Sequence, residues 1–161
     1  MIHYTLINPF TGFSKTVPKT ELLQNLMLNY ILLQGNNHIG VVTYRDLVVF
    51  ARRCADVIKN RMIELPEPDS LYAIQLADQW LEDPNSLSCE QLDFIAGHVI
   101  PNDETSIWSP DWVIASPVRV IANANWALEI IAELAWSLDY HAIIAYETQA
   151  QTFVEHLQSG K

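Results

Sequence analysis

The histidines and carboxylates of this chain are the side chains whose types suit acid–base or metal chemistry. None of the five histidines stands at the His-x-x-x-His spacing that places two zinc ligands on one helical face. Asp139-Tyr140-His141 could form an acid–base group, but a histidine at a helix end equally stabilises the negative end of the helix dipole. An enzyme using His141 or His98 is therefore a lesser alternative. We predict no catalytic residue, no metal site and no cofactor.

Two further patterns, a cysteine beside arginines and a pair of glutamates, could indicate a reactive thiol or a metal site, but each also has a structural explanation. Arg52 and Arg53 could lower the pKa of the neighbouring Cys54 thiol, yet Cys54 has the helical phase of the apolar residues and should point inward. Glu129 and Glu133 stand one turn apart, as in helical di-metal carboxylate sites. Those sites also need a Glu-x-x-His partner, which does not occur in this sequence. We interpret the two glutamates as a polar strip on a helix.

The charge of the chain is divided between its two parts. Residues 1–62 hold seven Lys or Arg and three acids, a net charge of +4, whereas residues 63–161 hold two basic and sixteen acidic residues, a net charge of −14. The acidic part would repel phosphates, so we predict no direct binding to nucleic acid. It is compatible with docking onto a basic protein surface, and also with a face that only keeps the protein in solution.

Within the acidic part, carboxylates and tryptophans fall in the same segments. Tight inhibitors of basic proteins commonly combine carboxylates that steer the partner with aromatic anchors that supply contact energy. The alternative is a solvated acidic face with tryptophans folded back onto the core. The candidate partner-binding residues are Asp78, Glu82, Asp83, Glu90, Asp93, Asp103, Glu104, Trp108, Asp111 and Trp112.

The composition predicts a single domain that builds its own core. The chain has 161 residues, and half of them are hydrophobic. No run approaches the roughly 18 apolar residues of a membrane span, and the N-terminus lacks the features of a secretory signal. Cys54 and Cys89, at no metal-ligand spacing, are expected to be small core residues in a reducing compartment. We therefore expect a cytoplasmic protein that makes no contact with membranes.

The stretch over residues 117–158 is the element around which the rest is expected to pack. It has no glycine and is apolar over most of its helical circumference, which is typical of a buried helix. Ser116 and Pro117 predict its N-cap and first residue, and a turn is expected near residues 138–140.

The remaining elements are predicted from capping residues and from the spacing of apolar residues. Thr43 and Asp46 predict a capping box that opens a helix over 44–62, and Ser88 and Gln91 predict a second box. The predicted order is an extended segment at 2–8, a helix at 19–35, a loop at 36–40, and helices at 44–62, 70–83 and 89–97. The fold class is therefore all-α: one domain, 1–161, of about six helices with a short extended N-terminal segment and a possible elbow at 64–69.

Residues 73–92, AIQLADQWLEDPNSLSCEQL, together with ANANWALEIIAELAW and HAIIAYE further on, resemble the all-helical immunity proteins of bacterial polymorphic toxin systems. In that family a helix ending in Trp-Leu precedes a Ser-x-Glu-x-Leu helix start and alanine-spaced helices. The resemblance covers about residues 70–150. This chain has fewer alanines and larger Ile and Leu residues, and its N-terminal third has no counterpart. The resemblance implies a helical protein that silences a cognate toxin and has no catalytic residues.

These observations together predict a non-enzymatic, acidic protein that neutralises a basic partner protein such as a toxin or nuclease, as an immunity protein or similar inhibitor does. The alternative is a helical adaptor or dimerisation module, in which the apolar final helices complete a core across the two-fold axis of a homodimer.

Overall fold

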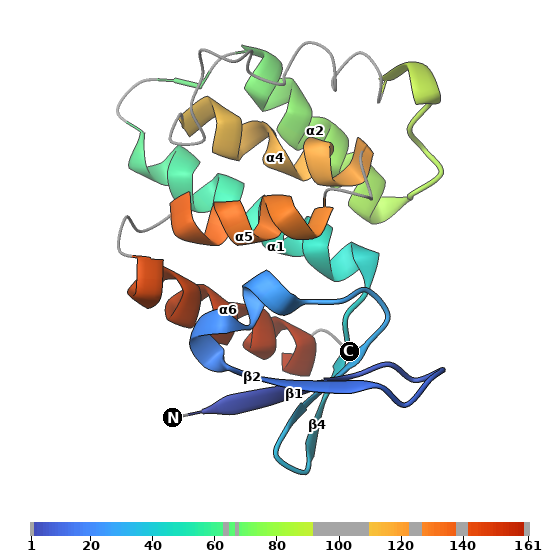
Figure 1. The fold of residues 1–161 in the computed structure, drawn as a ribbon. Helices are drawn as coiled ribbons and strands as arrows, with labels where there is room; N and C mark the ends of the chain where they lie inside the picture. Colours follow the sequence, from blue (N-terminus) through green and yellow to red (C-terminus); the bar gives the residue numbers. More distant parts are fainter. Residues whose placement is uncertain are drawn as a thin grey trace.

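The computed structural model describes residues 2–62, 65–66, 68–91, 110–122, 127–137 and 142–159, without the side chains of 110–112, 135–137 and 142–146. Strands and short 3₁₀ turns come first along the chain, and long helices follow (Figure 1). The elements are β1 (His3–Ile7), β2 (Ser14–Pro18), η1 (Lys19–Glu21), η2 (Leu23–Asn25), β3 (Ile31–Gln34), β4 (Asn37–Val41), α1 (Tyr44–Arg61), α2 (Pro68–Glu82), α4 (Pro110–Ala122), α5 (Ala127–Ser137) and α6 (Ala142–Ser159).

The prediction of an all-α fold is wrong, because the first 41 residues form a four-stranded antiparallel sheet with the order β2-β1-β3-β4. The molecule is an α/β protein in which sheet and helices occupy separate parts of the chain. The extended segment predicted at 2–8 is present, as β1. The N-terminal part of the chain is therefore much more than an extension of a helical bundle.

The helix predicted at 19–35 and the loop predicted at 36–40 are replaced by η1, η2 and the β3–β4 hairpin. The leucines of this stretch have helical spacing, but Leu32 is fully buried between the partly exposed Ile31 and Leu33, which is the alternation of a strand. Gly35, the last residue of that predicted helix, instead lies in a two-residue hairpin loop with φ +60°. That positive φ is typical of a type II′ turn, which matches the twist of the strands.

A connected set of buried residues joins the sheet to the helices. Tyr4 and Leu6 of β1 belong to it, together with Leu47 of α1, Ile131 of α5 and Phe153 of α6. Helix α6 lies between α5 and the sheet and contacts η1 and β4, whereas α1 packs mainly against α4 (Figure 1). The interior face of the sheet is thus covered by helices that come from the other end of the chain.

The predicted helix 44–62 is confirmed as α1, and its capping box is present. The Thr43 hydroxyl oxygen accepts a bond from the Asp46 backbone N–H at 3.2 Å, and an Asp46 carboxylate oxygen accepts one from the Thr43 N–H at 3.0 Å. The second predicted box is present too: Gln91 N–H donates to the Ser88 hydroxyl at 3.1 Å, and Ser88 N–H donates to the Gln91 side chain at 2.9 Å.

Helix α2 begins at Pro68, close to its predicted start. The predicted elbow at 64–69 begins between α1 and α2, and its last two residues are the first two of α2. Part of it is outside the described residues, and Leu65 is 90 % exposed there. The turn expected near 138–140 also falls outside them, while α5 and α6 lie on either side as separate helices.

The prediction that a helix begins at Ser116-Pro117 is wrong, because both residues lie inside α4 and are buried. Proline cannot donate to the carbonyl four residues earlier, so this helix lacks one internal hydrogen bond. Val113, Ile114 and Val118 are at most 2 % exposed, and their burial offsets the loss. A Ser-Pro pair marks a helix start only when packing leaves the preceding residues outside the helix.

The last turn of α4 is closed by a side chain from α1. The Tyr44 hydroxyl donates to the carbonyl of Val120 and lies 2.8 Å from the carbonyl of Ile121. The last carbonyls of a helix have no partner within the helix, so this hydroxyl takes the place of a C-cap. The ring of Tyr44 also packs edge-on against Trp80 of α2, with 5.9 Å between the ring centroids.

No helix within the described ranges is both long and apolar enough to cross a lipid bilayer.

Replacing Tyr44 with Phe keeps the ring against Trp80 and removes only the hydroxyl. We expect the free energy of unfolding to fall by about 1–2 kcal/mol, because the α4 carbonyls lose their donor. Urea denaturation of wild type and Tyr44→Phe measures this difference. Tyr72→Phe is the matched control, because Tyr72 is 38 % exposed on α2, and equal losses in the two variants would contradict the cap.

We also predict that the stability difference between wild type and Tyr44→Phe depends on pH. Burial raises the pKa of Tyr44 from 10.0 to about 12, so the hydroxyl keeps its proton more strongly in the folded than in the unfolded chain. Its stabilisation is complete below about pH 10 and is lost as the pH rises toward 12. The stability difference between wild type and Tyr44→Phe should therefore shrink over this range, and a constant difference would contradict the assignment.

Candidate functional site

Of the acidic residues predicted to bind a partner, the structure describes the side chains of four, and these lie in one stretch of the chain. We call residues 78–90 the 78–90 segment; it contains Asp78, Glu82, Asp83 and Glu90, all exposed, and no lysine or arginine. It comprises the end of α2 and the turn that follows. Asp93, Asp103, Glu104 and Trp108 lie outside the described residues, and Asp111 and Trp112 lie in α4 with undescribed side chains.

Two of the four carboxylates of the 78–90 segment have bonds within the protein. Arg52 of α1 binds Asp78 with two nitrogens, at 2.7 and 3.3 Å, and binds Asp56 at 2.5 Å. The Asp83 carboxylate accepts a bond from the Asn85 backbone N–H at 3.0 Å. Their charges are therefore partly used to hold α2 against α1 and to shape the turn.

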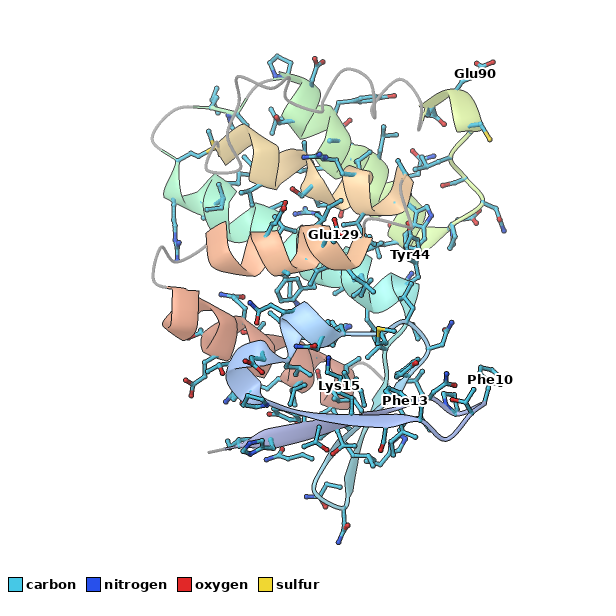
Figure 2. The ribbon with its side chains drawn as sticks, in the orientation of Figure 1. Phe10, Phe13, Lys15, Tyr44, Glu90 and Glu129 are labelled. Atoms are coloured by element: carbon cyan, nitrogen blue, oxygen red, sulfur yellow. The ribbon has the colours of Figure 1, made fainter. Side chains whose placement is uncertain are left out.

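Glu82 and Glu90 are the members of the segment that remain available. Within the described part of the chain, the side chain of neither residue has a hydrogen bond or an ion pair. The turn between them is fixed by bonds of Ser86, whose N–H and hydroxyl both donate to the Asp83 carbonyl, at 3.0 and 2.7 Å. Within the described part of the chain, the segment thus displays unpaired carboxylates from an ordered backbone, and Glu90 lies far from the sheet (Figure 2).

Trp80 is the one tryptophan whose side chain the structure describes. It is partly buried and packs on Tyr44, so it serves the junction of α1 and α2. The expectation of tryptophan anchors concerned Trp108 and Trp112, and it stays a prediction.

The structure also contains an acid–base pair that the sequence analysis missed. His156 near the end of α6 lies 2.8 Å from Asp46 of α1, between Nε2 and Oδ1, and both side chains are largely buried. The second carboxylate oxygen of Asp46 accepts bonds from the N–H and the hydroxyl of Thr43, at 3.0 and 2.6 Å. Asp46 was recognised only as a helix cap, because a partner 110 residues away leaves no local pattern.

The hydrogen bonds to Asp46 decide its charge. Burial alone would raise its pKa, but the bonds from His156 and Thr43 outweigh burial, and the pKa lies below the ordinary 3.8. The Thr43 hydroxyl is bonded to Asp46 and not to His156, so the imidazole does not activate this hydroxyl as a nucleophile. The geometry fits a structural contact that holds α6 against the start of α1 better than it fits a catalytic dyad.

The His-based alternative cannot be placed on this structure, since His98 and His141 both lie outside the described residues. Among the residues that are described, no three His, Cys, Asp or Glu side chains are grouped as a metal site would need. Glu129 and Glu133 are exposed on α5. Partial burial raises the pKa of Glu133, the charge of Glu129 adds to the rise, and Arg119 of α4 opposes it.

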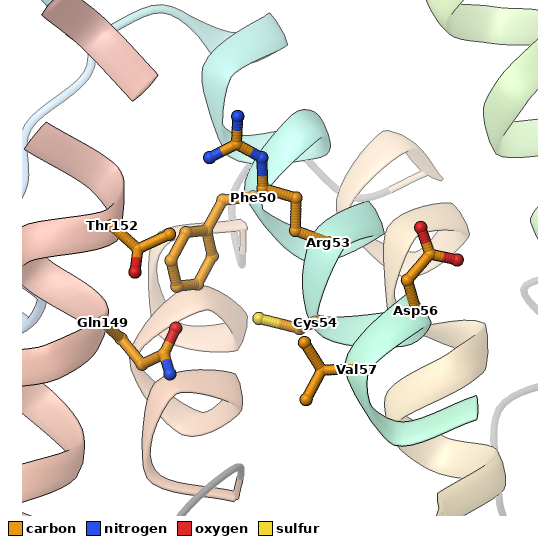
Figure 3. Close-up of a pocket in the computed structure, with 7 residues that line it drawn as sticks. All are labelled: Phe50, Arg53, Cys54, Asp56, Val57, Gln149 and Thr152. Carbon is orange, nitrogen blue, oxygen red and sulfur yellow. The ribbon is translucent and has the colours of Figure 1, made fainter. Parts of the chain in front are cut away.

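Cys54 is buried, as predicted, whereas Cys89 is exposed and the prediction of a core residue is wrong there. The reason is that Cys89 directly follows the cap residue Ser88, at a helix start that points to solvent. Burial raises the pKa of the Cys54 thiol despite the nearby Arg53, so this thiol stays protonated. It lies in a groove of about 370 Å³ between α1 and α6, with Phe50 and Val57 on one side and Gln149 and Thr152 on the other (Figure 3).

Comparisons with protein-family models, with curated proteins and with solved structures gave no match. The function must therefore be argued from the residues of this chain.

The Asp46–His156 pair predicts how stability depends on pH. Asp46→Asn should lower the free energy of unfolding at pH 7 by about 1 kcal/mol, because charge-assisted bonds become neutral ones. The pKa of Asp46 is lowered in the folded protein, so the advantage of wild type is present above pH 3.8 and is lost as the pH falls below that value.

Urea denaturation at pH 7 and pH 3 checks this expectation. The matched control is Asp69→Asn, an exposed acid in the first turn of α2. If Asp46→Asn and Asp69→Asn have equal effects at pH 7, the pair does not stabilise the fold.

Proposed function

We propose that this protein is a non-enzymatic binding protein that neutralises a basic partner protein, as an immunity protein or a similar inhibitor does. The supporting observation is the 78–90 segment, in which Glu82 and Glu90 are exposed, have no partner within the described part of the chain and flank an ordered turn. Carboxylates presented by an ordered backbone lose little conformational freedom on binding, which favours affinity.

The distribution of positive charge supports the same proposal. Five of the seven basic residues before Met62 lie in α1, at Arg45, Arg52, Arg53, Lys59 and Arg61. Arg52 neutralises Asp78, and Arg45 donates to the Leu81 carbonyl at 2.6 Å rather than to a carboxylate. The cations near the 78–90 segment thus leave Glu82 and Glu90 uncompensated, and a basic partner would gain by meeting them.

The resemblance to immunity proteins supports the proposal only over residues 70–150. Its implication of an all-helical protein does not fit the N-terminal sheet. Within the described residues of 70–150, however, all long elements are helices. The sheet lies in the N-terminal third, for which the resemblance offered no counterpart.

The adaptor alternative rested on apolar final helices in need of a partner. Ile130 and Leu134 of α5 and Phe153 and Leu157 of α6 are at most 6 % exposed within the single chain, so their hydrophobicity is accounted for without a second copy. A homodimer remains a prediction with no observation of its own to favour it.

The experiment captures the partner from an extract of the source cells and compares two double variants. Glu82→Lys/Glu90→Lys changes the net charge from −10 to −6, since each substitution adds two charges. At low ionic strength we expect the association rate with the captured partner to fall about tenfold, and the difference to shrink as salt screens the charges. Surface plasmon resonance at several salt concentrations measures both effects.

The matched control is Glu21→Lys/Glu147→Lys, two exposed glutamates on η1 and α6 with the same change in net charge. It should alter the rate much less. An equal effect of the two double variants, or capture of acidic partners only, would remove the proposal.

A further inference from the structure

The β1–β2 hairpin displays two phenylalanines from a rigid turn. Phe10 is 89 % exposed and Phe13 is 60 % exposed. Asn8 orders the turn: its N–H donates to the Phe13 carbonyl at 2.8 Å, its carbonyl accepts from Gly12 N–H at 2.9 Å, and its side-chain oxygen accepts from Phe10 N–H at 2.9 Å. Gly12 has φ +75°, a conformation that other residues rarely adopt. An ordered turn that exposes two large apolar side chains is a candidate contact surface.

An apolar groove of about 260 Å³ lies between this hairpin and residues 24–30. Leu6 and Leu26, both at most 3 % exposed, form its floor. Phe13 and the 44 % exposed Met27 form its walls. Lys15 is the single charged residue in its lining, and it donates to the Asn25 side chain at 2.5 Å, which leaves two of its three N–H donors.

The groove borders an edge strand with unused backbone groups. In β2, the odd-numbered residues form the backbone hydrogen bonds to β1. The two bonds that flank the strand pair show this register: Asn8 N–H donates to the Phe13 carbonyl, and Lys19 N–H donates to the Ile2 carbonyl. The N–H and C=O groups of Ser14 and Thr16 therefore point away from β1. In the described part of the chain β2 pairs with β1 alone, so these groups form a free edge. Such an edge is a template for a further strand.

The charges indicate which kind of strand can use this edge. Pairing of two β2 edges from two copies would bring Lys15 toward its counterpart and would join two chains of net charge −10. A segment that carries an Asp or Glu meets attraction at Lys15 instead. An apolar side chain two residues from that acid would lie on the same face of the added strand and would fill the space between Phe13 and Met27. One extended segment with these two side chains can therefore use the edge, the groove and Lys15 together.

We propose that β2 and this groove bind an extended segment of a partner protein by strand addition, with an apolar side chain between Phe13 and Met27 and, two residues along the segment, a carboxylate at Lys15. Phe10, Phe13 and Lys15 follow one another along the hairpin from its tip, far from Glu90 (Figure 2). This surface is separate from the 78–90 segment, and its use does not depend on the function proposed for that segment.

The test uses the full chain as bait for a displayed library of random dodecapeptides. We expect enrichment of peptides with a large apolar residue within two positions of an Asp or Glu. Thr16→Pro removes an outward N–H without removing a bond to β1, and it should weaken binding of an enriched peptide about tenfold. Thr16→Val is the matched control, because it keeps the N–H and removes only the 2.9 Å hydroxyl contact with Thr5.

Two side-chain variants test the groove. Lys15→Glu should weaken the same peptide about tenfold by like-charge repulsion, and Met27→Ser should weaken it severalfold by loss of apolar contact. Circular dichroism and urea denaturation confirm that each variant is folded. An absence of enrichment, enriched peptides without acids, or equal losses in Thr16→Pro and Thr16→Val would overturn the proposal.

Discussion

The first turn of α1 is the junction on which the rest of this structure depends. Thr43 and Asp46 cap the helix, the second face of the same carboxylate holds His156 of α6, and Tyr44 closes the last turn of α4. Three elements that are far apart in the sequence therefore meet within four residues. The Thr43 and Tyr44 bonds satisfy groups that a helix end leaves without a partner, and the Asp46–His156 bond joins two largely buried side chains. The cost of losing one of them therefore exceeds that of an ordinary surface contact.

Two surfaces of the molecule have different physical character. At the end of α2 an ordered turn carries acids and little apolar surface, whereas the β1–β2 hairpin carries exposed phenylalanines and a single lysine beside a groove. A charged surface mainly affects the rate and selectivity of association, while apolar contacts near a backbone edge mainly affect how long a complex lasts. Arg52 shows why total charge is a poor guide to such surfaces, because it neutralises part of the acidic face from within the fold.

Two errors of the sequence analysis, at residues 19–35 and at Ser116-Pro117, have the same physical origin. Residues 19–35 have helical spacing of leucines, but the strands β1 and β3 gain more by pairing than the segment gains as an isolated helix, whose stability depends on a packed face. Ser116-Pro117 carries the signature of a helix start, yet tertiary packing draws the preceding residues into the same helix. Local preferences are worth a fraction of a kcal/mol per residue, and burial of several large side chains outweighs them.

The sequence by itself determined the features that depend on near neighbours: α1 with its Thr43–Asp46 box, the Ser88–Gln91 box, the inward Cys54 and the separation of charge along the chain. Only the tertiary structure decided the sheet, the His156–Asp46 bond and the groove beside β2, together with which carboxylates stay unpaired. The reason is physical. Capping and helical phase are set within one or two turns of backbone. Strand pairing instead joins separate segments, such as Thr5 with Leu33, and the His156–Asp46 bond joins residues 110 positions apart.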